Sequence, residues 1–251
     1  MTKLKHKDYF FTTKEINFTP IDRYSDSAVK KIFNFAYAMA FAEGHHRSYR
    51  SGGRERRKNG QIFINAFQGK LAELAVSNTI KQYASDSAGK VSKLDLSVHP
   101  ENIWDDYDII YKDMSFGVKS TKYYGNLLLL ETKDWNEKGE YIPNIKAGKK
   151  AVSDYFVLVR IKPSGEDLLK QHKILYSQEI NKDRLFALIN SRTWLYDIPG
   201  YIKHQDLQYI IRNQYILPQG SVLNKNTEMD ADNYYIQSGD MKNFIQLLFT
   251  L

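Results

Sequence analysis

The sequence predicts an α/β (α+β) fold in which helices flank a mixed central β-sheet. The first observation is a pair of strand-like runs in residues 104–122, joined by a polar turn at Lys112 and Asp113. The second is the run 61–84, where apolar residues recur at helical spacing. The third is the segment 154–161, whose residues suit a buried strand. Together they predict a sheet with helix 61–84 packed on one face.

Length and composition narrow the classes of protein. The chain has 251 residues, enough for one large domain, and no linker, repeat or low-complexity tract divides it. The net charge of +7 favours a polyanionic partner. The absence of cysteine excludes disulfides, thiolate zinc sites and cysteine nucleophiles. We see no secretory signal and no apolar run that could span a bilayer, so we expect a cytoplasmic protein that enters no membrane.

The N-terminal part combines an arm, a helix and a basic loop. Residues 1–25 mix charged and aromatic residues and predict an irregular arm lying on the body. A helix with a broad apolar face is expected over 28–43, with Asp26 or Ser27 as its cap and Gly44 as its end.

The basic loop follows over residues 45–60, where arginines alternate with glycine and serine. Such a run is either a solvated loop or a phosphate-binding one, since arginine forks fit phosphate oxygens and glycine allows close approach. We favour phosphate contact. His45 and His46 have no further ligand at metal-binding spacing, and we take them as surface or DNA-contacting residues. The cations of the loop are Arg47, Arg50, Arg54, Arg56, Arg57 and Lys58.

The helix over 61–84 carries one stripe of small and apolar residues that contains Glu73 as its carboxylate. Glu73 therefore either reaches solvent from the edge of the stripe or serves a site. Gly69, one turn earlier, lowers helix propensity by about 1 kcal/mol and indicates close packing against another element. The stripe consists of Ile62, Ala66, Gly69, Glu73, Val76, Ile80 and Tyr83.

The central hairpin places charges in strands that should be buried. Asp108 lies between Tyr107 and Ile109, and Lys119 follows Val118. Buried charges are costly unless they pair or bind a ligand. Strand alternation puts Gly117, Lys119 and Thr121 on one face. The nearest alternatives to Asp108 are Asp105 and Asp106, which fit the turn entering the strand.

These residues resemble a known family. Tyr-Asp-Ile-Ile, Val-Lys-Ser-Thr and the helical Gln-Gly-Lys-Leu-Ala-Glu are similar to the PD-(D/E)XK nuclease superfamily, and most of all to its type II restriction endonucleases. The resemblance covers residues 61–162. It implies a restriction-endonuclease-like core with Asp108 as the strand acid, Lys119 as the lysine and Glu73 as the helix acid. The family carries an acid two residues before the lysine, where this chain has Gly117.

The resemblance also implies an activity, namely sequence-specific cleavage of double-stranded DNA with Mg²⁺. Carboxylates and main-chain carbonyls hold Mg²⁺, and a lysine stabilises the charge of the transition state. Asp108, Glu73 and the carbonyl of Val118 would hold the metal, and Glu131 is a weaker candidate. Ser120 and Lys122 would join the basic loop in contacting DNA.

Two other functions remain open. A non-cleaving DNA-binding protein with the same fold would account for Gly117. A basic RNA-binding or scaffold module would use Asp108 and Lys119 as a structural ion pair. A further alternative for Lys119 alone is a lysine on an edge strand, where its charge prevents pairing with other chains.

Further elements complete the expected fold. We expect the central sheet to contain 106–111, 115–121, 126–131 and 154–161. A strand over 91–98, a polar loop over 135–150 and a strand-like piece over 173–176 are also predicted. Helices are expected over 178–191 and 204–212. The whole chain, 1–251, would be one nuclease domain whose turn-rich part from about 192 onward recognises DNA.

Assembly and base reading follow from the resemblance. Type II restriction enzymes commonly act as two-fold dimers, so we expect a homodimer. The aromatic face of helix 28–43 and the apolar tail 244–251 are the two possible interfaces, although the tail could instead dock on the core. Polar side chains suited to the major groove are Lys203, His204, Gln205, Gln219, Asn224, Lys225 and Asn226.

Overall fold

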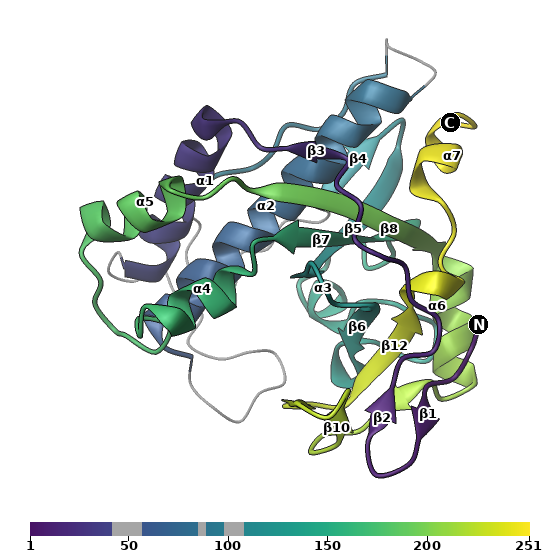
Figure 1. Cartoon of the computed structure of the whole chain (residues 1–251). Coiled ribbons are helices and arrows are strands. Elements are labelled where there is room, and N and C mark those ends of the chain that lie inside the picture. The colour runs from purple at the N-terminus through teal and green to yellow at the C-terminus, as the bar shows by residue number, and fades with distance from the viewer. Residues whose placement is uncertain (42–56, 85–88, 98–107) are drawn as a thin grey trace.

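The computed structural model describes residues 1–41, 57–84, 89–97 and 108–251, and it confirms the mixed α/β fold (Figure 1). A central mixed sheet has helices packed on one face and a smaller sheet with its own helix on the other. In this described part, no helix is long and apolar enough to cross a membrane.

The central sheet has the strand order β3-β8-β7-β5-β4. β5 and β7 run parallel, and the other neighbours are antiparallel. The strands predicted at 115–121 and 154–161 are therefore confirmed as members of one mixed sheet, as are Ile109–Tyr111 of the strand predicted at 106–111. Residues 106 and 107 lie outside the described residues. The strands are β3 (Asp22–Arg23), β4 (Ile109–Tyr111), β5 (Met114–Lys122), β7 (Tyr155–Lys162) and β8 (Leu195–Lys203).

The turn of the β4–β5 hairpin is formed by Lys112 and Asp113, as predicted. Both residues have positive φ, 47° and 63°, which is the requirement of a two-residue type I′ turn. Asp is one of the few side chains that tolerate this left-handed conformation. The turn fixes the register, in which Ile109 lies opposite Phe116.

Helix α2 (Asn59–Tyr83) lies against the central sheet and confirms the helix predicted at 61–84. It is buried on most of its circumference rather than along one stripe, because the sheet, α1 (Asp26–Phe41) and α4 (Gly165–Gln171) surround it. Helix α5 (Lys182–Asn190) packs beside α1, and α7 (Phe244–Leu248) closes the far end of this layer. This core includes Phe116 and Val118 of β5 and Val157, Val159 and Ile161 of β7.

The predicted strand 126–131 exists but belongs to a different sheet. β6 (Leu127–Glu131) pairs with β12 (Asn233–Gln237), which also pairs with β9 (Ile216–Leu217). The prediction that it lies in the central sheet was wrong, because a leucine run indicates a buried strand without indicating its partner. Helix α6 (His204–Arg212), predicted with the same bounds, covers this sheet.

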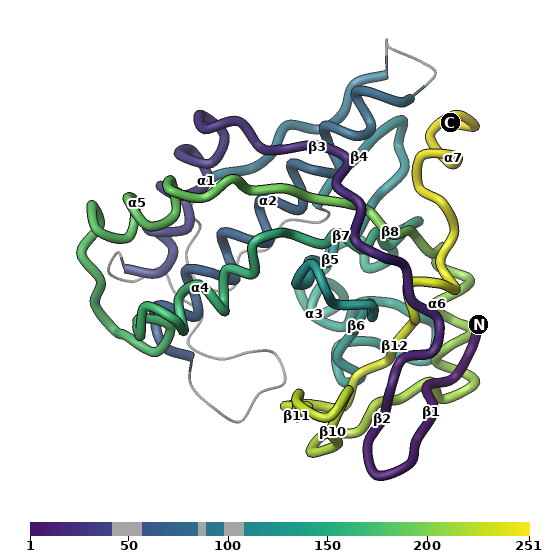
Figure 2. Tube along the Cα trace, viewed as in Figure 1, coloured from purple at the N-terminus to yellow at the C-terminus, as the bar shows by residue number. Residues whose placement is uncertain are grey.

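The N-terminal arm is more regular than expected. β1 (Lys5–His6) and β2 (Phe10–Phe11) form a small sheet with β10 (Val222–Leu223) and β11 (Thr227–Glu228). Figure 2 shows the arm continuing from this sheet at the lower right to β3 beside β8. The start of the chain is thus joined to residues 222–228 through strand pairing.

Three smaller predictions differ from the structure. Residues 89–97 form only an isolated bridge, between Val91 and Tyr111, and not a strand. Residues 173–176 form a turn, with Lys173 at φ 56°. The polar segment 135–150 contains a short helix, α3 (Ile142–Lys146), and it follows a 3-10 turn at Thr132–Asp134.

Candidate active site

Asp108 lies at the open end of the β4–β5 hairpin, opposite its turn. It directly precedes β4, and its Oδ2 accepts a hydrogen bond from the Val118 N–H at 2.6 Å. Continuing the register of Ile109 and Phe116 by one residue places Asp108 opposite Gly117. The carboxylate is therefore fastened to the strand that carries Lys119, next to the position where the family has its second acid.

Lys119 lies half-buried on the face of the central sheet that is turned away from α2. Its neighbour on β7 is Leu158, which belongs to the core between the central sheet and the β6-β12-β9 sheet. We call these the second core and the second sheet. Val118 belongs instead to the first core, which lies under α2. Gly117 shares the face of Lys119, since it pairs with Phe156 of the second core. The alternation along β5 thus follows the predicted pattern.

Gly117 has no room for a side chain without movement of its neighbour. A Cβ atom at this position would lie 3.0 Å from Cδ1 and 3.2 Å from Cε1 of Phe156, and 3.4 Å from Oγ of Ser153. Phe156 is itself buried and packs edge-on against Trp135, with 5.3 Å between the ring centres. The ring of Phe156 therefore occupies space that the second acid of the family would need.

Glu73 is buried on α2, as its place in the sequence predicted. Its Oε2 accepts a hydrogen bond from Lys70 Nζ at 2.8 Å, and that ammonium also lies 5.7 Å from the ring centre of Phe35. Since α2 and Lys119 lie on opposite faces of the sheet, the structure shows no direct contact between Glu73 and Lys119. Gly69 is not closely packed, because no described atom lies within 4 Å of a Cβ placed there.

The candidate residues supply only part of a coordination shell for Mg²⁺, and the substrate phosphate would have to supply further ligands. Within the described ranges, no three Asp, Glu or His side chains lie close enough together to hold a metal ion. Asp108 and the main chain at Val118 offer one carboxylate and one carbonyl. Mg²⁺ is commonly held by one or two carboxylates, with waters and phosphate oxygens completing the shell. Asp105 and Asp106 lie outside the described residues.

Glu131, the weaker candidate, ends β6 in the second sheet. It lies opposite Asn233 of β12, and its Oε2 is shielded from solvent. It is therefore held by a strand that does not pair with β5.

Part of the predicted DNA-contacting set can be located. Arg57 and Lys58 immediately precede α2, and Ser120 is exposed on β5. Lys122 forms ion pairs with Glu166 at 3.2 Å and Asp167 at 3.6 Å. Burial lowers the pKa of Lys122, but Glu166, Tyr124 and Asp167 together outweigh this and hold the pKa above its ordinary value. The residues outside the described ranges are His45, His46, Arg47, Arg50, Arg54 and Arg56.

The predicted base-reading residues are spread over two places. Lys203, His204 and Gln205 surround the start of α6, where His204 Nε2 lies 3.0 Å from the carbonyl oxygen of Gly139. Asn224 and Lys225 form the β10–β11 turn, with φ of 48° and 73°. Neither place adjoins Asp108 along a shared strand.

A charged cluster at the end of β5 was missed from the sequence. Glu166 and Asp167 begin α4 and hold Lys122, and Lys170 completes the cluster through a 2.6 Å contact with Glu166. The sequence did indicate the start of α4, because Ser164 and Asp167 have the spacing of a helix-capping box. In the structure, Ser164 Oγ accepts the Asp167 N–H at 3.3 Å.

A surface cavity of about 120 Å³ lies elsewhere on the fold. It is at the junction of β3, the start of α1 and the turn after α5, where Arg23, Asp26 and Arg192 line it with both signs of charge. It includes none of the motif residues, so it is not part of the candidate active site.

The two surfaces expected to form a dimer interface are used within the chain. Phe244 and Leu248 of α7 are buried in the first core, which is the alternative expected for the tail. The aromatic face of α1 also packs inward, where Phe33 contacts Phe63 of α2 and Phe186 of α5.

Comparisons with protein-family models, curated proteins and solved structures found no match to this chain. The likeness to the nuclease superfamily therefore rests on the motif residues and on where the structure places them.

Proposed function

We propose that the protein is a metal-dependent endonuclease that cleaves double-stranded DNA at specific sites in the manner of type II restriction enzymes. The observation that supports this most is the 2.6 Å hydrogen bond from Val118 N to Asp108 Oδ2. This hydrogen bond holds Asp108, which precedes β4, against β5, the strand that carries Lys119, at the open end of the hairpin. The excess of positive charge, +7, suits a polyanionic substrate.

Each residue then has a role in phosphodiester hydrolysis. Mg²⁺ bound by Asp108 and the Val118 carbonyl would lower the pKa of an attacking water and polarise the phosphoryl group. Lys119 would stabilise the negative charge that develops on the phosphate oxygens. Glu73 contributes only if its contact with Lys70 is exchanged for a contact with the site when DNA binds.

A second candidate is a DNA-binding protein that does not cleave. The observation in its favour is the ring of Phe156, which fills the space beside Gly117 where the family has an acid.

We also propose a homodimer acting in the cytoplasm, as the likeness to restriction enzymes implies, with an interface other than α7 or the aromatic face of α1. Molecular mass in solution, with and without DNA, tests the assembly.

Plasmid digestion separates the two candidates. The wild-type protein with Mg²⁺ should give discrete fragments, and EDTA should prevent their formation. Lys119→Met, which keeps much of the side-chain volume, should abolish cleavage and leave DNA affinity close to wild type, since the lysine acts mainly in the transition state. Lys133→Met, at an exposed lysine after β6, is the matched control. Binding without cleavage by the wild-type protein would favour the second candidate, and cleavage by Lys119→Met would remove the lysine from the site.

A further inference from the structure

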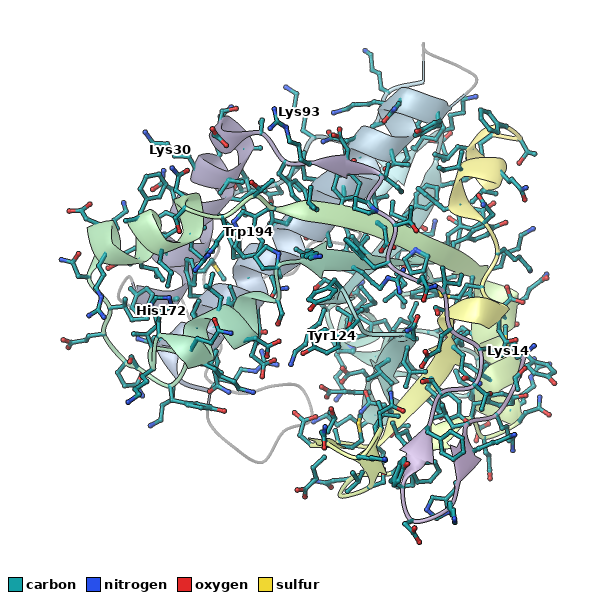
Figure 3. The ribbon with its side chains drawn as sticks, in the orientation of Figure 1. Lys14, Lys30, Lys93, Tyr124, His172 and Trp194 are labelled. Atoms are coloured by element: carbon teal, nitrogen blue, oxygen red, sulfur yellow. The ribbon has the colours of Figure 1, made fainter. Side chains whose placement is uncertain are left out.

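The turn that follows β5 carries two adjacent tyrosines. The rings of Tyr123 and Tyr124 meet edge-on, with 5.0 Å between their centres and an interplanar angle of 82°. Phe18 of the N-terminal arm extends the row, 5.9 Å from Tyr123. Tyr124 is 52% exposed, and Figure 3 shows it between α4 and the second sheet. An exposed aromatic ring in this position contributes nothing to the core.

Tyr124 is nevertheless held in place. Its hydroxyl donates a hydrogen bond to Asp167 Oδ2 at 2.8 Å, and Lys122 Nζ lies 5.8 Å from its ring centre. Lys122 is in turn anchored to Glu166. The ring is thus oriented before any ligand arrives, which reduces the entropy that binding costs.

Positive charge lies beside the rings. Lys162 is exposed at the end of β7 and places Nζ 5.2 Å from the ring centre of Tyr123. The parallel register, which pairs Lys122 with Ile161, brings the ends of β5 and β7 together. Three lysines (122, 162 and 170) and two acids (166 and 167) leave this region with a formal charge of +1, since 3 − 2 = 1. In the described part of the chain, Lys162 has no carboxylate within ion-pairing distance.

We propose that Tyr123 and Tyr124 form a stacking site for an unpaired DNA base, with Lys162 beside the adjoining phosphate. Rings next to a cation are the combination by which proteins bind single-stranded nucleic acid, because every base has a π-face and every nucleotide a negative charge. The choice of DNA rests on the proposed function. The site directly follows β5, the strand of Lys119, and the four residue steps from Lys119 to Tyr123 span at most roughly 13 Å. It would therefore receive a base displaced from the helix close to the point of cleavage.

Binding of a fluorescein-labelled oligothymidylate, measured by anisotropy in EDTA, tests the site without cleavage. Tyr124→Ala should weaken binding about five- to hundred-fold, the range for loss of one stacked base. Tyr124→Phe retains the ring and should keep most of the affinity. Tyr209→Ala, at a 47% exposed tyrosine on α6, is the control and should bind as wild type. Thermal unfolding of each variant shows whether the fold is intact.

A second readout reports stacking directly. An oligonucleotide containing 2-aminopurine should lose fluorescence on binding to the wild-type protein and lose less on binding to Tyr124→Ala. Affinity for a blunt duplex should not depend on Tyr124. Unchanged oligothymidylate binding by Tyr124→Ala, or an equal loss with Tyr209→Ala, would overturn the stacking site. These results are independent of cleavage, so a failure of the nuclease proposal would appear only in the digest.

Discussion

Arg160 of β7 and Asp197 of β8 form a buried bidentate ion pair, with Nε–Oδ1 at 2.9 Å and Nη2–Oδ2 at 2.5 Å. Arg160 has no exposed surface. Its remaining donors reach the carbonyl oxygens of Ile16 and Asn17 and the side-chain oxygen of Asn126. Asp197 Oδ2 also accepts the N–H of Thr19. The pair therefore fastens the N-terminal arm to the central sheet.

Removal of one partner should destabilise the protein strongly. Arg160→Met leaves the Asp197 carboxylate buried without its cation, and we expect a loss of about 3–5 kcal/mol in the free energy of unfolding. Urea denaturation measures the change. The control is Lys242→Met, because Lys242 pairs with Asp206 at 3.1 Å on the surface and should contribute about 1 kcal/mol or less. Similar losses in the two variants would contradict the role of burial.

A substitution of Asp108 separates the electrostatic role of its carboxylate from the structural role of its hydrogen bond. Asp108→Asn keeps an oxygen that can accept the Val118 N–H, so its stability should stay near wild type. It loses the negative charge, and cleavage should fall roughly 100-fold or more, as when one electrostatic group of an active site is removed. Asp108→Ala should lose both cleavage and about 1 kcal/mol of stability. Asp113→Asn, in the turn of the same hairpin, should cleave normally. Normal cleavage by Asp108→Asn would assign the acid a purely structural role.

The sequence predicted those elements whose signal is local. Helix 204–212 was found with its bounds because the apolar residues that indicate it lie within the helix itself. The β4–β5 hairpin was found because Lys112 and Asp113 interrupt two strand-like runs. Strand pairing is not local, so the partner of β6, which lies about 100 residues later in β12, could not be predicted.

The candidate site shows the same limit. The alternation of β5 predicted that Gly117 and Lys119 share a face, since this depends only on the period of a strand. The face on which α2 packs depends on tertiary structure, and therefore the contact of Glu73 with Lys70 rather than Lys119 was not foreseen. Nor could the sequence show that Phe156 fills the space beside Gly117.

The contact between Gly117 and Phe156 leads to a stability prediction. Gly117→Ala brings Cβ to 3.0 Å from the ring and should cost about 1–3 kcal/mol, as overpacking does. Phe156→Leu in the same chain should recover part of that loss. Gly69→Ala is the contrasting control, because it meets no described atom within 4 Å and should stabilise α2 by about 1 kcal/mol. A neutral Gly117→Ala would mean that the ring moves easily and that an acid could be accommodated.

The basic loop remains a prediction from the sequence. Neutralising Arg54, Arg56 and Arg57 to Gln should weaken DNA binding and flatten its dependence on salt. Each phosphate contact contributes about 0.9 to the slope of log affinity against log salt, so three contacts contribute up to about 2.7. Lys30→Gln with Lys31→Gln, on the exposed side of α1, is the control. An unchanged slope in the arginine variant would show that the loop is solvated and does not contact DNA.

The acids at the start of α4 should make stability depend on pH. Burial raises the pKa of Glu166, but hydrogen bonds from Lys170 and Lys122 outweigh it and leave the pKa below 4.5, its ordinary value. Burial likewise raises the pKa of Asp167, and Ser164, Tyr124 and the charges of Lys122 and Lys170 together bring it below 3.8. A carboxylate with a depressed folded-state pKa stabilises the protein above its unfolded pKa. That stabilisation is lost as the pH falls through the folded-state value.

We therefore expect that Glu166 and Asp167 do not change the urea concentration at the unfolding midpoint near pH 6. As the pH decreases from about 5 towards 3, their protonation should lower that midpoint. Glu166→Gln removes one titrating group, so its stability should decrease less over this interval than that of the wild type. Glu228→Gln, at an exposed position in β11, should follow the wild-type curve. The measurement is a series of urea titrations across this pH range. If Glu166→Gln and wild type lose stability in parallel, the ion pairs with Lys122 and Lys170 do not stabilise the folded state, because their loss on protonation would then have no effect.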